Sequence, residues 1–203
     1  TAAVVSGQRV SLGVGAGWCR EEFEQTGQDF TTRGQRLDEM IEQLRRLWTG
    51  QPVAHQGRYY QFGELSLAPT PVRPVAILCG GDTPRALKRA AHLGDGWIGV
   101  TYTLSEAAEV VERLRGELKS VGRETDLGFK VMLAYRGRVD LSVVDALSRL
   151  GVTDLVTAPW MNIQRANSPL RVPHHLVVSA IQRFGSEVIA PLARANQTHL
   201  PSR

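Results

Sequence analysis

The segment from residue 33 to residue 48 has the alternation of apolar and polar positions that is typical of an amphipathic helix. Apolar residues recur every three or four positions, and the charged residues fall mostly between them. A helix of this kind lies on a core with its other face in water. The predicted inward positions are Leu37, Met40, Ile41, Leu44, Leu47 and Trp48.

The segments on either side of this helix have a different pattern. The apolar run from Arg9 to Val14 predicts a short buried strand. The helical period is lost from Val53 to Pro74, where the chain ends in "APTPVRP". Because prolines exclude a helix and favour extended chain, we expect a hairpin or another ordered excursion there.

Strand and helix patterns then alternate. "VAILC" and "GWIGV" predict strands, and the helix between them has Pro84 in its first turn and Gly94 just past its end. Thr103 and Glu106 have the spacing of a capping box, which opens a helix with apolar residues up to Leu118. The remaining predicted elements are a strand from Phe129 to Ala134, a helix capped by Asp140 and ended by Gly151, and a strand from Asp154 to Thr157.

A last helix is expected from about His174 to Ala193. Its predicted inward residues are Leu176, Val177, Ile181, Phe184, Val188 and Leu192. Five strands alternating with five helices predict a parallel sheet with right-handed crossovers. An open doubly wound sheet is complete with five strands, whereas an eight-stranded barrel needs three more units. The pattern alone therefore favours the open sheet.

Composition narrows the class of protein. The 203 residues are 42% hydrophobic and 22% charged, which is ordinary for one globular domain, here residues 1–203. No apolar run approaches the length of a membrane span, so a cytoplasmic protein is expected. The net charge of +4 is scattered, which argues against nucleic acid as a partner. Cys19 and Cys79 have no metal-ligand or disulfide pattern and are predicted to be free buried thiols.

The stretch "SLGVGAGW" contains three closely spaced glycines behind an apolar run. A dinucleotide fingerprint fails here, because the position of its third glycine is occupied by Trp18 or Arg20. A strand end fits better, since Gly15, Ala16 and Gly17 leave room for a planar ring beside the backbone and Trp18 would wall the pocket. The alternative is that the glycines only permit a bulge and a sharp exit.

Three long segments together resemble the luciferase-like monooxygenase family, especially its deazaflavin-dependent oxidoreductases. They are "RVSLGVGAGWCREEFEQTGQDFTTRGQRLDEMIEQLRRLWTG", "HQGRYYQFGELSLAPTPVRP" and "LCGGDTPRALKRAAHLGDGWIGV". The resemblance implies an α/β fold, a (β/α)8 TIM barrel in which the glycine segment ends the fourth strand. It also implies that this chain carries strands 4 to 8 and lacks the first three strands. Beyond Thr101 only the strand and helix rhythm carries the resemblance.

The resemblance implies coenzyme F420 as the cofactor, with FMN as the alternative. Residues that would border the cofactor are Gly15, Ala16, Gly17 and Trp18 with Glu21 and Glu22, while Gly80, Gly81, Asp82 and Thr83 would cradle its phosphate. Backbone N–H groups after a strand and at a helix start form an anion-binding nest, which supports the second set. Asp82 counts against it, because its carboxylate would compete with phosphate, and Asp82 or Thr83 could instead cap the helix.

Substrate contacts are expected from loops after the later strands, which nominates Tyr102, Arg136 and Trp160. Trp160 could equally cover the end of a core. His174 and His175 are expected to be solvated, and Asp95 precedes its strand, where a role in stability is expected. The sequence shows no catalytic residue and no metal-ligand set.

These observations favour an oxidoreductase that transfers a hydride between coenzyme F420 and a small organic substrate. An FMN-dependent monooxygenase of the same family is the first alternative. A non-catalytic fragment or binding module and a complete flavodoxin-like domain that binds FMN are the others. The resemblance also implies a homodimer.

Overall fold

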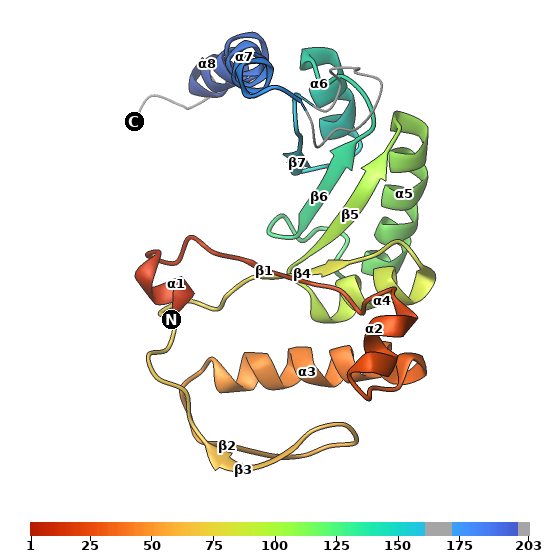
Figure 1. The fold of residues 1–203 in the computed structure, drawn as a ribbon, viewed down its shortest axis with the longest axis vertical. Coiled ribbons are helices and arrows are strands. Elements are labelled where there is room, and N and C mark those ends of the chain that lie inside the picture. The colour runs from red at the N-terminus through yellow and green to blue at the C-terminus, as the bar shows by residue number, and fades with distance from the viewer. Residues whose placement is uncertain (161–171, 199–203) are drawn as a thin grey trace. The chain divides into compact units, whose positions relative to one another are not determined.

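The computed structural model describes residues 1–160 and 172–198 (Figure 1). The chain divides into two compact units, Thr1–Gly99 with Arg113–Lys130 and Val100–Glu112 with Val131–Arg203. Strand β5 (Gly96–Tyr102) and helix α5 (Leu104–Ser120) contribute residues to both. The single domain over residues 1–203 stays a prediction.

The strands follow one another in the sheet in the order of the chain. The five-stranded sheet has the order β1 (Leu12–Val14), β4 (Ile77–Gly80), β5 (Gly96–Tyr102), β6 (Lys130–Tyr135) and β7 (Asp154–Val156). The pairs β1/β4, β4/β5 and β6/β7 are parallel. A doubly wound sheet reverses its strand order at a switch point, and consecutive units of a (β/α) barrel do not. The doubly wound topology that the pattern favoured is therefore wrong.

The first unit contains the predicted long helix and hairpin. Its elements before β4 are α1 (Ala2–Val5), β1, α2 (Arg20–Gln25), the 3-10 turn η1 (Phe30–Thr32), α3 (Arg33–Leu47), β2 (Val53–Gln56) and β3 (Gln61–Leu65). On α3, Leu37 and Ile41 are buried as predicted, whereas Met40 is 39% exposed, so its predicted inward position is wrong. The antiparallel pair β2/β3 confirms the hairpin. Helix α2 was not predicted.

Helix α4 (Pro84–Leu93) packs against α3 through an ion pair in which the arginine is buried and the aspartate is partly exposed. The guanidinium group of Arg89, 9% exposed, contacts the Asp38 carboxylate and donates to the Gly34 carbonyl at 3.0 Å. Asp95 lies at the amino end of β5, where its carboxylate accepts hydrogen bonds from the Ile77 amide and Arg45, both at 2.8 Å. These contacts join Asp95 to β4 and α3, and its role in stability stays a prediction.

Helices α5 (Leu104–Ser120) and α6 (Leu141–Arg149) begin at the predicted caps. The Thr103 amide donates to the Glu106 carboxylate at 2.7 Å, and the Glu106 amide donates to the Thr103 hydroxyl at 3.3 Å, which completes a capping box. Asp140 accepts from the Val143 amide at 3.0 Å. In the second unit the buried apolar side chains include Ala107, Val110, Leu133, Val143 and Leu147.

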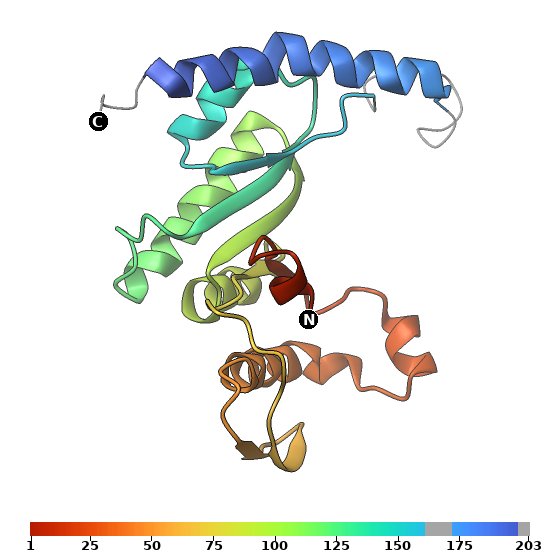
Figure 2. The same ribbon diagram turned by 90° about the vertical axis from the view of Figure 1, so that its left-hand side faces the viewer.

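A long helix closes the described chain. It consists of α7 (His174–Phe184), a π-helical segment (Gly185–Ile189) and α8 (Ala190–Thr198), which Figure 2 shows as one continuous rod. Within residues 174–195 of this helix only Ala180 and Val188 are buried, and Ile181 is 48% exposed. The predicted inward position of Ile181 is therefore wrong.

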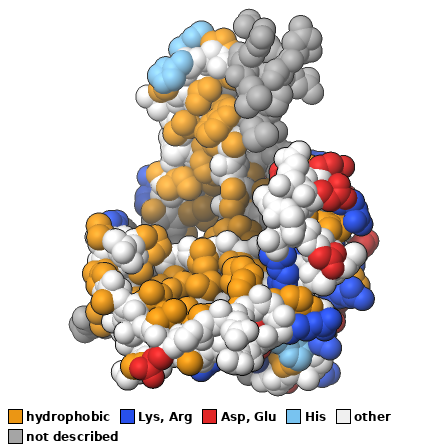
Figure 3. Space-filling view, turned by 60° about the horizontal axis from the view of Figure 1, so that its bottom comes forward, with side chains coloured by type: hydrophobic (Ala, Val, Ile, Leu, Met, Phe, Trp, Pro, Cys, Tyr) orange, Lys and Arg blue, Asp and Glu red, His pale blue; other side chains and the backbone are white. Residues whose placement is uncertain are grey.

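Large apolar side chains remain exposed on this helix and elsewhere, and hydrophobic side chains gather on the face that Figure 3 shows. Among the described residues, His174–Ala195 is long and apolar enough to cross a membrane by length and composition alone, with a mean hydropathy of 1.2. The sequence analysis expected no such segment. Core helices of soluble proteins pass the same test, so this finding by itself does not assign a membrane.

Candidate functional site

The loop after β1 has the small residues that the sequence analysis assigned to a cofactor. Val14 ends β1 beside Cys79 of β4, and the backbone of Gly17 has φ +86°. A Cβ atom on Gly17 would lie 2.9 Å from the Phe23 ring, so glycine is needed both for conformation and for space. Trp18 is 88% exposed. The part of the chain described here gives Trp18 no closed pocket to wall, and its contact with a ring stays a prediction.

Arginine side chains hold this loop in place. Arg33 Nε donates to the Gly17 carbonyl at 3.1 Å, and the Arg33 guanidinium lies 3.6 Å from the centroid of the Phe30 ring. The guanidinium of Arg20 lies 4.6 Å from the same ring. Both positions are typical of cation–π contacts. The sequence analysis missed Arg33, whose contact with Gly17 spans sixteen positions of the chain.

Cys19 and Glu21 lie at the start of α2, just after the glycines. Cys19 is half-buried, so the prediction that both thiols are buried is wrong for this residue. Its Sγ lies 3.3 Å from the Glu21 carboxylate. The pKa of the Glu21 carboxyl is lowered, because its own backbone N–H and then the Cys19 thiol donate hydrogen bonds to the carboxylate. Glu21 is therefore ionised at neutral pH, where it would meet a bound anion as a like charge.

The carboxyl end of β4 lies beside the carboxyl end of β1 and is formed by Gly80 and Gly81. A Cβ atom on Gly80 would lie 3.2 Å from the Val14 carbonyl oxygen, and one on Gly81 would lie 3.0 Å from the Ala86 Cβ. Gly81 has φ +109°, and its carbonyl accepts a hydrogen bond from the Trp97 indole N–H at 2.6 Å. The two glycines therefore allow the backbone to pass close to its neighbours at this edge of the sheet, and a buried tryptophan holds Gly81 there.

Thr83 caps helix α4, which was one of the two alternatives predicted for this loop. Its hydroxyl accepts from the Ala86 amide at 3.3 Å, and Pro84 follows as the first helical residue. Asp82 is not the cap, and its backbone carbonyl accepts a hydrogen bond from the Arg113 guanidinium. Arg113 thus brings to the β4–α4 loop a positive charge that the sequence analysis did not place there.

The structure brings two of the three candidate substrate residues together in the second unit. The Arg136 amide donates to the Tyr102 carbonyl at 2.7 Å. The Arg136 guanidinium donates to the Thr101 carbonyl at 3.1 Å and lies 3.4 Å from the Glu106 carboxylate. Tyr102 is 7% exposed, whereas Trp160 lies half-buried in a turn after β7.

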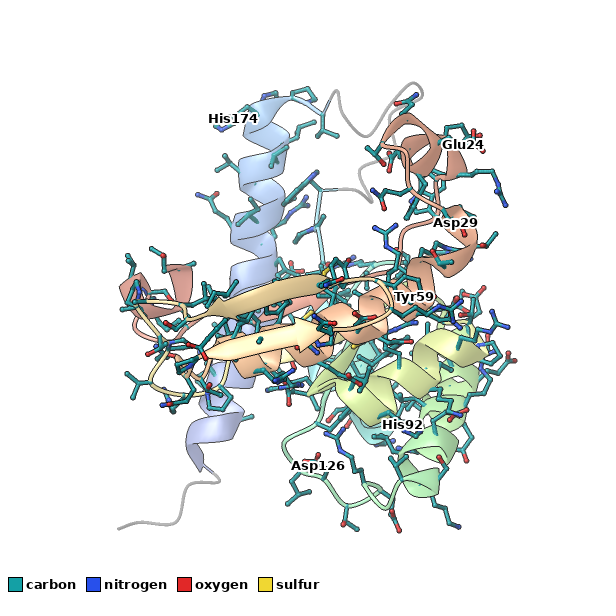
Figure 4. The ribbon with its side chains drawn as sticks, turned by 90° about the horizontal axis from the view of Figure 1, so that it is seen from below. Glu24, Asp29, Tyr59, His92, Asp126 and His174 are labelled. Atoms are coloured by element: carbon teal, nitrogen blue, oxygen red, sulfur yellow. The ribbon has the colours of Figure 1, made fainter. Side chains whose placement is uncertain are left out.

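The remaining polar residues considered from the sequence lie outside these two loops. His174 and His175 are exposed at the start of α7, as expected, and Figure 4 labels the first of them. Within residues 1–160 and 172–198, no group of three or more His, Cys, Asp or Glu side chains is arranged to hold a metal ion. A cavity in the second unit, lined partly by Arg138 and Arg183, was not predicted at all.

Known proteins match this chain over most of its length. An uncharacterized protein of Mycobacterium tuberculosis is 31% identical over 191 residues, which are 93% of this chain and 64% of that protein. The F420-dependent glucose-6-phosphate dehydrogenase of Amycolatopsis mediterranei is 35% identical over 144 residues, which are 66% of this chain and 43% of that enzyme. The chain thus spans less than two thirds of the length of these relatives.

A solved structure shows the same fold. The coenzyme F420-dependent tetrahydromethanopterin reductase of Methanopyrus kandleri aligns with a TM-score of 0.69 at 16% identity, over 92% of this chain and 75% of that one. Such neighbours are luciferase-like TIM barrels, which confirms the predicted fold class. A family model described as luciferase-like monooxygenase matches residues 1–168. The chain therefore belongs to the luciferase-like monooxygenase family.

Proposed function

We propose that this chain carries the cofactor-binding part of an oxidoreductase that transfers a hydride between coenzyme F420 and a small organic substrate. The observation that carries the proposal is the pair of neighbouring strand ends at Val14 and Gly80, where glycines leave the backbone bare. Sites of (β/α) barrels lie at this end of the strands. Two relatives described above are named as F420-dependent, which supports F420 as the cofactor.

The residues present fit an anionic, flat cofactor. Gly80 and Gly81 let the backbone pass close to Val14 and Ala86, and the loop they begin has the Arg113 guanidinium beside it. Gly15, Ala16 and Gly17 border the next strand end, and Trp18 is free to cover a ring there. When bound, F420 supplies two-electron hydride chemistry, while these residues bind and orient it.

The substrate side of the proposal rests on the second unit. Arg136 is fixed by the Thr101 carbonyl and Glu106, so its guanidinium is held at the carboxyl end of β5 and β6. Tyr102 and Trp160 follow β5 and β7 and remain candidates for contact with the substrate. A cytoplasmic homodimer is part of the same proposal.

FMN-dependent monooxygenation is the second candidate, because the family description itself names monooxygenases. Titration of the chain with F420 and with FMN separates the two, since cofactor fluorescence changes on binding. Tighter binding of F420 is expected. Tighter binding of FMN would favour the monooxygenase, and binding of neither would favour a non-catalytic module.

The phosphate cradle is tested by Gly81→Trp, with Gly81→Ala as its matched control. Both variants place a Cβ at φ +109° and close to Ala86, so they share the same backbone strain. Only the indole fills the space in front of the backbone. We expect Gly81→Trp to weaken F420 binding at least about tenfold relative to Gly81→Ala, which corresponds to about 1.4 kcal/mol.

Circular dichroism melting curves of the two variants show whether both are folded. Equal F420 affinity in two folded variants would contradict the assignment of Gly80 to Thr83 to the phosphate. Gly116→Trp, on an exposed face of α5 with nothing within 4 Å of the added Cβ, is expected to bind F420 like the unchanged chain.

A further inference from the structure

A cavity of about 210 Å³ lies in the second unit against the π-helical segment. Arg138, Thr157, Arg183 and Glu187 contribute polar groups to its wall, and Phe184 and Val188 are among its apolar residues. None of these residues belongs to the cofactor or substrate candidates described above. Ligand pockets usually measure about 300–1,000 Å³, so this cavity has room for one end of a small molecule.

The charges around the cavity do not cancel. Arg138 Nη2 lies 3.2 Å from the Glu187 carboxylate, so these two groups neutralise one another. The guanidinium of Arg183 has no hydrogen-bond or ion-pair partner among residues 1–160 and 172–198. Two guanidinium groups and one carboxylate leave a net charge of +1, which resides on Arg183.

The backbone beside the cavity is unusual. Residues Gly185–Ile189 form a π-helical turn between α7 and α8, and both Glu187 and Val188 belong to it. Val188 is 3% exposed, and Arg183 and Phe184 come directly before the turn. A π-turn inserts one residue into a helix and is frequent at functional sites. Arg183 and Phe184 just before the turn, and Glu187 and Val188 within it, all line the cavity.

The cavity also lies at the functional end of its strands. Arg138 follows β6, and Thr157 follows β7 immediately. In barrels of this class the active site lies at the carboxyl ends of the strands, whereas residues at the amino ends contribute to stability. A ligand in the cavity would therefore lie on the side where the proposed hydride transfer takes place.

We propose that this cavity binds a carboxylate group on a hydrocarbon part of the substrate, with Arg183 as its charged partner. The inference rests on the proposed function and adds a substrate class, a small organic acid. One carboxylate balances the net charge of +1, and Phe184 and Val188 pack against the adjoining carbon atoms. A phosphate monoester carries about −1.5 to −2 charges and would face the Glu187 carboxylate, so it fits less well.

Benzoate, benzamide and inorganic phosphate are suitable probes of the whole chain by isothermal titration calorimetry. Benzoate is expected to bind saturably, and its uncharged isostere benzamide at least about tenfold more weakly, since a charge-assisted hydrogen bond is lost. Arg183→Gln should weaken benzoate binding by about tenfold. Glu187→Gln should strengthen it several-fold, because it removes a like charge and releases Arg138.

Arg194→Gln is the matched control, because Arg194 is exposed on α8 and does not line the cavity. Its benzoate affinity should equal that of the unchanged chain. Benzoate that binds Arg183→Gln as tightly as the unchanged chain, or no tighter than benzamide, would overturn the inference. Stronger binding of inorganic phosphate than of benzoate would overturn the choice of a carboxylate.

Titration of the same preparations with F420 tests the proposed function separately from the carboxylate site. F420 binding without benzoate binding would overturn the carboxylate site and leave the oxidoreductase intact. Benzoate binding that depends on Arg183 in a chain that binds neither F420 nor FMN would support the cavity as a carboxylate site and overturn the proposed cofactor. Melting curves show that Arg183→Gln and Glu187→Gln are folded.

Discussion

At the scale of single residues, the Trp97 indole fixes the backbone of the cofactor candidate loop. Trp97 is fully buried, and its N–H donates to the Gly81 carbonyl at 2.6 Å. Trp97→Phe removes this donor and leaves a buried carbonyl without it, which costs about 1–3 kcal/mol of the free energy of unfolding. Urea unfolding measures the loss.

Trp48→Phe is the control for the loss of ring volume when tryptophan is replaced by phenylalanine. Trp48 is half-buried, and its indole N–H has no partner in the described residues. The Trp97 variant should therefore lose more stability than the Trp48 variant. Equal losses would show that the hydrogen bond to Gly81 contributes nothing beyond ring volume.

The two cysteines differ in burial, and we expect them to differ in reactivity. Cys79 is fully buried in β4, and burial raises the pKa of its thiol to about 11. Cys19 is half-buried at the start of α2. With Ellman's reagent at pH 8, we expect one thiol to react in the folded chain and both to react in denaturant. Rapid reaction of both thiols in the folded chain would contradict the structure around Cys79.

The role of a residue could be predicted where it depends on neighbouring residues in the sequence. It could not be predicted where it depends on a contact with a residue far away in the sequence. The caps at Thr83 and Asp140 follow from the residues next to them. Arg113 reaches a carbonyl 31 positions away, and no local pattern indicates such a contact. Long arginine side chains bind wherever the fold presents an oxygen atom, and this is why Arg33 and Arg113 were missed.

At the scale of elements, one carboxylate joins helix α3 to the β2–β3 hairpin. Glu39 accepts hydrogen bonds from the His55 ring at 2.8 Å and from the Tyr59 and Tyr60 amides, each at 3.0 Å. Figure 4 labels Tyr59 on this hairpin. Burial alone would raise the pKa of Glu39, but the hydrogen bonds from His55 and from the two amides outweigh it and lower that pKa below its ordinary 4.5.

A carboxyl group whose pKa is lowered by folding stabilises the folded state at any pH above its ordinary pKa. This stabilisation is lost as the pH falls through the pKa that the group has in the folded state. The hairpin should therefore stay docked at pH 7 and loosen below about pH 4.5. Glu39→Gln should reduce the protection of the hairpin amides at pH 7 and remove most of this acid dependence. Pulsed hydrogen exchange over Val53–Leu65 measures both effects.

Glu42→Gln is the matched control, since Glu42 is exposed on the same helix. Its hairpin protection should follow that of the unchanged chain at every pH. If the Glu42 and Glu39 variants behaved alike, the attachment of the hairpin would have to depend on other contacts, such as the Gln35 carbonyl with the Tyr59 hydroxyl.

Elements with a strong apolar period were predictable and short or irregular ones were not. The capping box and the apolar face of α5 predicted that helix, and its residues Val110, Val111, Leu114 and Leu118 are all buried. Helix α2 has six residues and too few apolar positions for a period. The π-turn has no sequence signal either, because Gly185–Ile189 continues the helical pattern on both sides.

At the scale of the whole molecule, apolar spacing could not choose between a barrel and an open sheet. Both architectures alternate strands with helices, and they differ in strand order, which depends on pairing between segments far apart in the chain. The observed order β1-β4-β5-β6-β7 and the match to luciferase-like barrels settle the choice. Only the long composite motifs of the first hundred residues contained this information.

Large apolar side chains are exposed on the described part of the chain. Val100 is 65% exposed, Ile189 52% and Val156 49%, and hydrophobic side chains gather on the face in Figure 3. We therefore expect the chain to pair with a second copy, in line with the predicted homodimer. Light scattering after gel filtration should give twice the 22.3 kDa of one chain at micromolar concentrations. A mass of one chain at every concentration would contradict the homodimer, because this exposed apolar surface would then be stable in water without a partner.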